Sequence, residues 1–338
     1  MELKRKWRND ATRQRRIAIK QYWEEVSHDL KNNPKNFFQT FKPFLDRKDK
    51  EENRKREIHL SSNGTLEKDR LVVAEYLSEY FSSIAKGIGG EQVDDLTEGH
   101  FIEHSGLHFI SSHMAESNDS FCFRPVNHYE VKDALENLNT RKAIGYEGLQ
   151  PRILKIVGEE LAPSLTRTLN TSIEHGTWLS EWKRGIWVPV YKSNNREEVK
   201  NYRPITVLPT LDKLFEKLLG KQFTEYMDPK LSNSLTAYRK NNGCETTLLR
   251  LVERWKLDLD SRKVVGVLSS DMSKAFDSVS PPLLIKKMES YSVSGSALNL
   301  LRTYFSHRRN KIKLGPVTSQ WKDTMRGCPQ GSSLGPLL

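Results

Sequence analysis

An apolar run that leads into an acidic residue restricts the fold of this chain more than any other feature. The run, Val264–Leu268, is rich in valine and is followed closely by Asp271. β-Branched residues in a short apolar run predict a buried strand. A short turn then presents Phe276 and a second carboxylate, Asp277. A strand that delivers a carboxylate to a sheet edge suits a hard cation such as Mg²⁺ held against phosphate.

Charge is distributed unevenly along the chain. The 338 residues contain 36% hydrophobic residues, which is enough to bury a core, and their formal net charge is +11. Residues 1–60 carry a net charge of +7, residues 61–120 carry −8, and residues 121–338 carry +12. A basic excess favours a polyanionic partner such as nucleic acid, although solvated helix faces explain much of the same charge.

Cysteine usage and apolar content indicate the compartment. The three cysteines, Cys122, Cys244 and Cys328, lie far apart and form no C-x-x-C pair, so we expect neither a disulfide framework nor a zinc knuckle. The first residues are too charged for a signal peptide, and no apolar run approaches membrane-spanning length. We therefore expect an intracellular, soluble protein of the nucleus, the cytoplasm or both, without a membrane partner.

Composition divides the chain into three parts. Residues 1–85 form a basic, mostly helical arm in which Asp69 caps a helix, and residues 86–120 are an acidic linker rich in Gly, Ser and His. Residues 121–338 alternate helix and strand, which predicts an α+β domain. The expected helices cover 131–138, 152–175 with a break near Pro163, 211–218, 245–260 and 282–306. The expected strands cover 185–192, 204–208, 264–268 and a hairpin at 311–321.

Two further segments carry residues suited to a phosphorylated ligand. The strands on either side of residues 193–201 would place Lys192 and Arg203 on one hairpin, where a point charge and a planar donor fork can grip a triphosphate. A solvated basic loop is the alternative. In the second segment Gly327 and Gly331 flank Pro329-Gln330, so the backbone can approach a ligand while the Gln330 amide faces a base or sugar. An ordinary Gly/Pro turn is the alternative there.

These segments in this order resemble the reverse transcriptase of non-LTR (LINE-like, jockey/CR-type) retrotransposons. The resemblance covers about 121–338 and is carried by Lys142–Gly148, Asn201–Leu208, Leu235–Arg239, Ser270–Asp277 and Gly327–Ser332. The arm at 1–85 resembles the connector between endonuclease and polymerase, through Lys31–Phe38 and Ser62–Gly64. The resemblance implies the fingers and part of the palm of a right-hand polymerase, preceded by the helical arm.

The resemblance also implies an activity and its partners. It implies an RNA-directed DNA polymerase that transfers a nucleotide from a dNTP to a DNA primer 3′-hydroxyl on an RNA template, with two Mg²⁺ ions. Asp271 matches the first metal-binding aspartate, and Phe276 matches the aromatic residue that excludes a ribose 2′-hydroxyl. Asp277 matches a recurrent position, to which we assign a structural role.

The remaining site residues implied by the resemblance bind the nucleotide. Lys192 and Arg203 match residues that hold the β- and γ-phosphates, and Gln330 and Gly331 match a motif that packs against nucleotide and template. The partner carboxylates of Asp271 would belong to a Tyr-x-Asp-Asp motif, and the sequence ends at Leu338 before any such motif. We therefore expect a truncated polypeptide that does not polymerise alone; the alternative function is an inactive fragment that at most binds nucleic acid.

A zinc hydrolase is a third possibility. His100, Glu103 and His104 match the H-x-x-E-H pattern, and His108 and His113 follow. Glycines flank the pattern within the acidic linker, and the residues there do not predict a scaffold helix. We therefore interpret the histidines as part of a connector.

Overall fold

The computed structural model describes residues 2–32, 57–62, 64–86, 96–114 and 119–338. The chain forms two compact units, residues 1–57 and residues 58–338. Most of the connector-like segment Lys31–Phe38, and Asn63 of Ser62–Gly64, lie outside the described residues. None of the helices in the described part of the chain is both long and apolar enough to cross a bilayer.

The first unit contains one long helix, α1 (Glu2–Asn32), which confirms the basic helix predicted at the N-terminus. Its cations Arg13, Arg15, Arg16 and Lys20 are exposed. Lys20 Nζ lies 3.8 Å from Glu24 Oε1, one helical turn away. Such an exposed pair contributes about 0.3–0.5 kcal/mol, so most of this positive charge remains available to solvent or to a partner.

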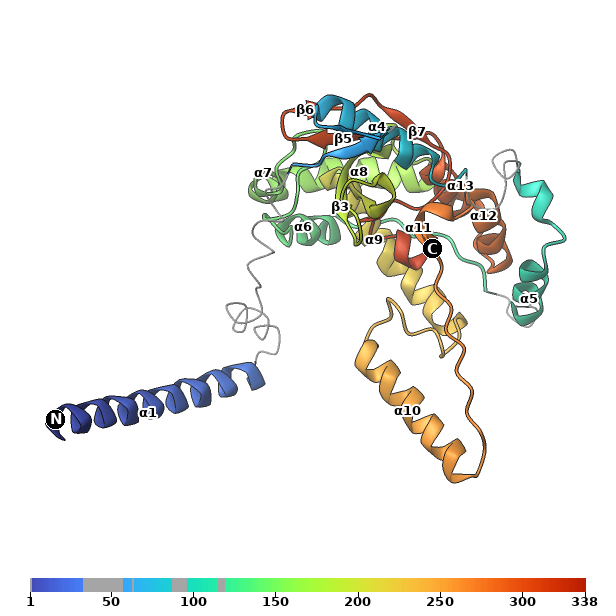
Figure 1. Cartoon of the computed structure of the whole chain (residues 1–338). Coiled ribbons are helices and arrows are strands. Elements are labelled where there is room, and N and C mark those ends of the chain that lie inside the picture. Colours follow the sequence, from blue (N-terminus) through green and yellow to red (C-terminus); the bar gives the residue numbers. More distant parts are fainter. Residues whose placement is uncertain (1, 33–56, 63, 87–95, 115–118) are drawn as a thin grey trace. The chain divides into compact units, whose positions relative to one another are not determined.

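The second unit combines helices with a mixed sheet, as expected for an α+β fold. Its helices are α4 (Arg70–Ser83), α5 (Ser105–Met114), α6 (His128–Glu136), α7 (Pro151–Ile156), α8 (Gly158–His175), α9 (Thr210–Met227), α10 (Cys244–Asp260), α11 (Ala275–Ser278), α12 (Pro281–Ser290) and α13 (Gly295–Phe305). Its strands are β1 (Leu60–Ser62), β2 (Thr65–Glu67), β3 (Arg184–Tyr191), β4 (Tyr202–Val207), β5 (Arg308–Leu314), β6 (Val317–Thr318) and β7 (Lys322–Thr324). Figure 1 shows these elements in order.

The main sheet has the strand order β4-β3-β5-β6, and β7 also pairs with β5. Strands β3 and β4 are antiparallel, with Val190 opposite Arg203, whereas β3 and β5 are parallel. Strands β5 and β6 form the predicted hairpin, in which Leu314 pairs with Val317. The parallel pair is joined through several helices, because parallel neighbours cannot be connected by a tight turn.

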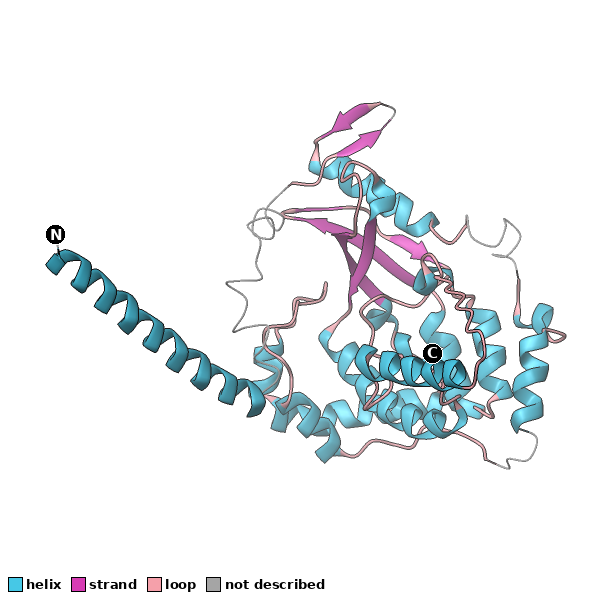
Figure 2. Cartoon of the chain, turned by 60° about the horizontal axis from the view of Figure 1, so that its bottom comes forward, coloured by secondary structure: helices cyan, strands magenta, loops and turns pink. Residues whose placement is uncertain are grey.

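Helix α4 covers one face of this sheet, and the larger helical layer lies on the other side (Figure 2). Asp69 caps α4 as predicted, since its carboxylate accepts hydrogen bonds from Leu71 N at 2.8 Å and Val72 N at 3.1 Å. The buried side chains of α4 face the sheet and form a core cluster with it: Leu60, Val73, Ala74, Leu77, Phe81, Ile84, Trp187, Tyr202 and Ile312. Residues 58–85, predicted from the sequence as part of the arm, thus belong to the second unit.

Helix α9 lies at the centre of the helical layer. Phe215, Leu219 and Phe223 of α9 are almost completely buried, in one cluster with residues of α6, α8, α12 and α13. Spacings of four residues place these side chains on one face of the helix, which is predicted over 211–218 and extends over 210–227. The predicted helices at 131–138, 245–260 and 282–306 are also present, the last as α12 and α13.

Two predicted details differ from the structure. The helix expected to break near Pro163 instead breaks at Val157, between α7 and α8, and α8 continues through Pro163. Proline removes one backbone donor, and Pro163 is the sixth residue of α8, so α8 lacks the one intrahelical hydrogen bond that this position would make to Glu159 O. In the segment predicted as a linker, α5 forms and buries Leu107 and Ile110, because it packs against α12.

The prediction of a strand at Val264–Leu268 is wrong. Residues 263–272 have no regular structure, and Val264 and Leu268 are 98% and 97% exposed. The described part of the chain offers this segment no neighbouring strand. β-Branched residues predict a segment that can be buried, but a strand forms only where a second strand satisfies its backbone groups. Helix α10, which precedes it, also has no buried residue, and Figure 1 shows both extending beyond the helical layer.

A matched pair of leucine substitutions tests this correction. We expect Leu268→Ala to change the free energy of unfolding by less than about 0.5 kcal/mol, because the side chain is almost fully exposed. Leu300→Ala removes the same atoms from a fully buried position and should cost about 2–5 kcal/mol. Urea unfolding measures both. Equal losses would show that Leu268 is buried in solution.

Candidate functional site

The β3–β4 hairpin places the two predicted phosphate ligands, Lys192 and Arg203, on one face. Arg203 lies opposite Val190, and Lys192 N extends the ladder by donating to Asn201 O at 2.8 Å. Side chains at alternate positions of a strand, and at directly opposite positions across a pair, share a face, so Lys192 and Arg203 point the same way. Both are exposed, and neither side chain makes an ion pair or hydrogen bond within the described residues. They are available to an anion.

The loop after β7 is fixed to two other elements through its backbone. Gly327 N donates to Val279 O and Cys328 N donates to Phe276 O, both at 2.8 Å, which holds the start of the loop against α11. Further along, Thr206 N of β4 donates to Gln330 O at 2.7 Å. The loop therefore connects the α11 turn to the strand that carries Arg203.

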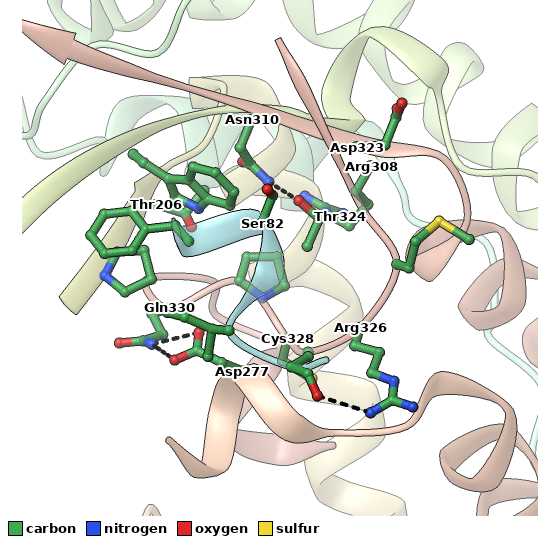
Figure 3. A pocket seen from close by; sticks show the side chains of 18 of the residues that line it. Ser82, Thr206, Asp277, Arg308, Asn310, Asp323, Thr324, Arg326, Cys328 and Gln330 are labelled. Carbon is green, nitrogen blue, oxygen red and sulfur yellow. Dashed lines mark hydrogen bonds between the residues drawn. The ribbon is translucent and has the colours of Figure 1, made fainter. Parts of the chain in front are cut away.

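A side-chain hydrogen bond completes this connection. Gln330 Nε2 lies 2.7 Å from both Oδ1 and Oδ2 of Asp277 (Figure 3). Burial raises the pKa of the Asp277 carboxyl, and the Gln330 amide and the charges of Lys274 and Arg203 oppose that rise. The Arg203 charge on the hairpin therefore acts on the Asp277 carboxyl. Gln330 is thus the hydrogen-bond partner of Asp277, for which a structural role is predicted from the sequence.

A buried polar network holds the end of the same loop. Glu216 of α9 is fully buried, and its Oε1 accepts a hydrogen bond from the Tyr304 hydroxyl at 2.9 Å. Its Oε2 accepts one from Ser333 N at 2.6 Å. Burial raises the pKa of Glu216, and the Ser333 N–H, the Tyr304 hydroxyl and the Arg308 charge oppose that rise. The loop is therefore held at its start, middle and end.

A second buried carboxyl lies one turn before Glu216. Asp212 accepts a hydrogen bond from Trp178 Nε1 at 2.9 Å, while its Oδ2 has no hydrogen-bond partner among the described residues. Burial and the neighbouring Glu216 charge raise the pKa of Asp212 well above its ordinary value. A raised pKa favours the protonated form, which removes the cost of a second buried charge.

A cavity of about 250 Å³ lies beside the Asp277–Gln330 pair (Figure 3). Its walls come from the C-terminal end of α4, from β3, β4, β5 and β7, and from the loop at 326–330. Lys86, Arg308 and Arg326 line it together with Phe81 and Trp187. Cationic and aromatic side chains therefore line the same cavity as Gln330, which is predicted to contact the nucleotide.

Phe276 and Asp271 differ in their surroundings. Phe276 lies in α11, is half-buried, and meets the Tyr238 ring edge-on at a centroid distance of 6.4 Å. Asp271 is exposed and precedes α11 in the segment without regular structure. Among the described residues no group of three or more His, Cys, Asp or Glu side chains could hold a metal ion.

The structure thus brings some of the predicted residues together. Gln330 and Gly331 lie against β4, Phe276 is bonded to the same loop through Cys328 N, and the Arg203 charge acts on Asp277. Asp271 and Lys192 make no side-chain hydrogen bond or ion pair with these residues in the described structure.

The histidines at 100–113 do not form a zinc site in the described residues. His100 Nδ1 accepts a hydrogen bond from Thr97 N at 3.0 Å, and His104 Nδ1 accepts one from Gly106 N at 3.1 Å. His108 Nε2 lies 3.4 Å from Glu103 Oε2. His100 and His104 thus bond to backbone N–H groups in turns before or at the start of α5, whereas His108 and His113 lie within α5.

Known proteins match the part of the chain that builds this site. The family model described as reverse transcriptase (RNA-dependent DNA polymerase) matches residues 190–338. Residues 190–338 are similar to the reverse transcriptase family. All six predicted site residues of this reverse transcriptase segment lie within the match: Lys192, Arg203, Asp271, Phe276, Gln330 and Gly331.

Individual relatives extend the match to earlier residues. The chain is 27% identical over 217 residues to the probable RNA-directed DNA polymerase from transposon X-element of Drosophila melanogaster, covering 63% of this chain and 24% of the relative. It is 26% identical over 217 residues to the RNA-directed DNA polymerase from mobile element jockey of Drosophila funebris, again covering 63% and 24%. For the Pol polyprotein from type-1 retrotransposable element R2 of Popillia japonica, identity is 27% over 223 residues, covering 64% and 29%.

These relatives confirm the resemblance to the polymerases of non-LTR retrotransposons. The chain spans about a quarter of the length of the first two, since 24% of each is covered.

The buried network within residues 190–338 was not predicted from the sequence. Asp212 and Glu216 are four residues apart within an otherwise apolar helix pattern, and both are fully buried. Acidic residues on the apolar face of a predicted helix are the signal that could have revealed them, because a buried carboxyl requires partners. The residues of α4 that line the cavity carried no comparable signal.

Proposed function

We propose that residues 121–338 form the fingers and part of the palm of an RNA-directed DNA polymerase. The reaction is transfer of a nucleotide from a dNTP to the 3′-hydroxyl of a DNA primer on an RNA template. One observation supports this most: a single loop bonds to the α11 turn through Asp277 and to strand β4 through Thr206. The loop thus joins α11 to the β3–β4 hairpin. Helix α11 contains Phe276, which is predicted to exclude a ribose 2′-hydroxyl, and the hairpin contains Arg203, a predicted phosphate ligand.

Each residue has a distinct role in this proposal. Lys192 and Arg203 hold the β- and γ-phosphates, as their shared exposed face allows. Phe276 excludes a ribose 2′-hydroxyl, and Gln330 with Gly331 contacts the nucleotide and the template. The net charge of +12 over residues 121–338 supports binding of RNA and DNA, whose phosphates such a surface attracts. We place the protein inside the cell, in the nucleus, the cytoplasm or both.

Asp271 fits the role of one Mg²⁺ ligand. Mg²⁺ is commonly bound by one or two carboxylates together with substrate phosphates and several waters, and the Asp271 carboxylate is exposed and accessible. When bound, a pair of such ions would neutralise the triphosphate and activate the attacking hydroxyl. Asp271 would then hold and orient the metal–nucleotide complex rather than bind a free ion alone.

Nucleic-acid binding without polymerisation is the second candidate function. The observation in its favour is the position of Asp271 in a segment that lacks regular structure. A polymerase must hold a metal ligand in a fixed geometry, whereas electrostatic binding to a phosphate backbone requires no such order.

Binding of Mg²⁺–dTTP to the 338-residue chain tests the proposed function. We expect Lys192→Ala and Arg203→Ala each to weaken binding by about 10- to 100-fold, because each removes a charged hydrogen bond to phosphate. Lys200→Ala is the matched control from the same hairpin, where Lys200 Nζ lies 2.9 Å from Glu198 Oε2; its affinity should not change. Isothermal titration calorimetry gives the three dissociation constants.

The same preparation separates the two candidate functions. Salt-dependent RNA binding with no measurable dTTP binding would favour the second function over the first. Equal dTTP affinity in all three variants would overturn the assignment of Lys192 and Arg203 as phosphate ligands.

A further inference from the structure

The contact between Asp277 and Gln330 fixes which end of an amide faces a ligand. A glutamine amide has a donor end and an acceptor end that are almost the same shape, so only its partners decide its orientation. Here Nε2 lies 2.7 Å from both carboxylate oxygens of Asp277. A carboxylate accepts hydrogen bonds, and the reversed amide would place Oε1 against two negatively charged oxygens. The carbonyl oxygen of Gln330 therefore points away from Asp277.

The backbones on both sides of the pair are fixed. Phe276 and Val279, which flank Asp277, accept hydrogen bonds from Cys328 N and Gly327 N. The Gln330 carbonyl accepts a hydrogen bond from Thr206 N. The side chains thus meet between anchored segments, so the contact does not depend on a freely moving loop.

Burial raises the pKa of the Asp277 carboxyl, and polar and charged neighbours oppose that rise. Lys274 and Arg203 both act to lower the pKa of this carboxyl against the effect of burial. Lys274 itself is held by α4, because its Nζ donates to the Tyr80 hydroxyl at 2.7 Å. Both residues of the pair also line the cavity of about 250 Å³.

We propose that Asp277 is a positioning residue for nucleotide binding, which holds the Gln330 amide so that its carbonyl oxygen accepts a hydrogen bond from the nucleotide. The proposal rests on the proposed function and deepens it. It assigns Asp277 no contact with metal or substrate. It also gives Gln330 a defined chemical preference, for a ligand group that donates a hydrogen bond, such as a sugar hydroxyl or a base amine.

A double-mutant cycle on the full chain tests this assignment. We expect Asp277→Ala to weaken Mg²⁺–dTTP binding about tenfold, as does Gln330→Ala, and the double variant to be no weaker than Gln330→Ala. A residue that acts through Gln330 has nothing left to position once that amide is gone. Asp133→Ala is the control, an exposed acid on α6 that accepts a hydrogen bond from Asn137 of the same segment; binding should not change.

Stability measured on the same variants separates positioning from folding. Urea unfolding should show that all variants remain folded under the binding conditions, and that the loss of stability for Asp277→Ala is smaller in the Gln330→Ala background, where its partner is already gone. The effect of Asp277→Ala on affinity should appear only when Gln330 is present. If the losses of affinity add, Asp277 acts independently of Gln330 and the assignment is overturned. Unchanged affinity in Asp277→Ala, with binding still sensitive to Arg203→Ala, overturns this inference and leaves the proposed function intact. No dTTP binding by the wild type overturns both.

A swap of the two functional groups provides a second test. In Asp277→Asn/Gln330→Glu the new amide can donate to the new carboxylate, so the contact is restored with its polarity reversed. We expect the swap to regain stability relative to Gln330→Glu alone, which places two carboxylates together. Its dTTP affinity should also recover relative to Gln330→Glu alone, because the new carboxylate at position 330 can accept from the new amide at position 277 through one oxygen and still present the other oxygen as an acceptor to the nucleotide. Affinity no better than that of Gln330→Glu would contradict the proposal.

Discussion

Glu216→Ala is expected to cost about 3–5 kcal/mol in the free energy of unfolding. The substitution leaves the Tyr304 hydroxyl and Ser333 N without the carboxylate that accepts their hydrogen bonds at 2.9 Å and 2.6 Å. It also removes the negative charge that acts on the buried guanidinium of Arg308, which is 3% exposed. Removing one partner from a buried charged network is costly because the other groups remain desolvated. Urea unfolding followed by tryptophan fluorescence measures the loss.

Glu225→Ala is the matched control on the same helix. Glu225 is exposed, so its removal should change stability by less than about 0.5 kcal/mol. A loss for Glu216→Ala no larger than the control would mean that Glu216 is solvated and that the network does not hold the loop.

Glu216→Gln adds a pH dependence with a defined sign. Burial raises the pKa of Glu216 above its ordinary value of 4.5, with Ser333 N–H, the Tyr304 hydroxyl and Arg308 opposing the rise. A raised pKa in the folded state contributes stability below the unfolded value, and this contribution is lost as pH rises through the folded value. Glutamine does not titrate. The stability of Glu216→Gln relative to wild type should therefore increase from pH 4 upward, and a constant difference would contradict the raised pKa.

Periodicity predicted the helices because it reports which residues can share a buried face. The helix capped by Asp69 and the helix through Leu214 and Phe215 formed as expected, since their apolar spacing matches one helical face. The strands at 184–191 and 202–207 also formed, and they are partners of each other. In each case the element that completes the packing lies in the described chain.

The same reasoning failed for Val264–Leu268 because composition does not supply a partner. A valine-rich run can be buried only against another surface, and in the described residues that surface is absent. Pro163 shows the opposite error, since a residue that disfavours helices was accommodated inside α8. Propensity is a local quantity, and tertiary packing decides the outcome in both cases.

The sequence predicts a set of site residues but not the contacts between them. The motifs identified Gln330 and, as a structural position, Asp277, yet nothing in the sequence places the Gln330 amide on that carboxylate. The two residues are 53 positions apart, and no periodic pattern links them. The contribution of α4 to the cavity arises from similarly distant packing.

The glycines of the loop were predicted to let a ligand approach, and the structure shows a different close approach. A Cβ on Gly331 would lie 2.7 Å from the Thr206 carbonyl oxygen, and one on Gly327 would lie 2.8 Å from the Phe276 carbonyl oxygen. Both glycines have positive φ, +120° and +83°. The glycines therefore allow the loop to pack against the backbone of β4 and α11, which is what positions Gln330.

Gly331→Ala is accordingly expected to cost on the order of 3 kcal/mol. A φ of +120° is unfavourable for any residue with a Cβ, and overlap with the Thr206 backbone adds to that strain. Gly266→Ala is the matched control, because Gly266 has no atom within 4 Å of an added Cβ and no positive φ. It should be neutral, or more stable by about 0.4–1 kcal/mol through the unfolded chain.

Two measurements check the Gly331→Ala prediction. Urea unfolding gives the loss of stability, and amide hydrogen exchange at Thr206, whose N–H donates to Gln330 O at 2.7 Å, reports whether the loop has separated from β4. We expect faster exchange at Thr206 in Gly331→Ala and unchanged exchange in Gly266→Ala. Because Gln330 adjoins Gly331, the same variant should also weaken dTTP binding about as much as Asp277→Ala does. Equal stability and equal Thr206 exchange in both alanine variants would show that the loop does not rest on β4 in solution.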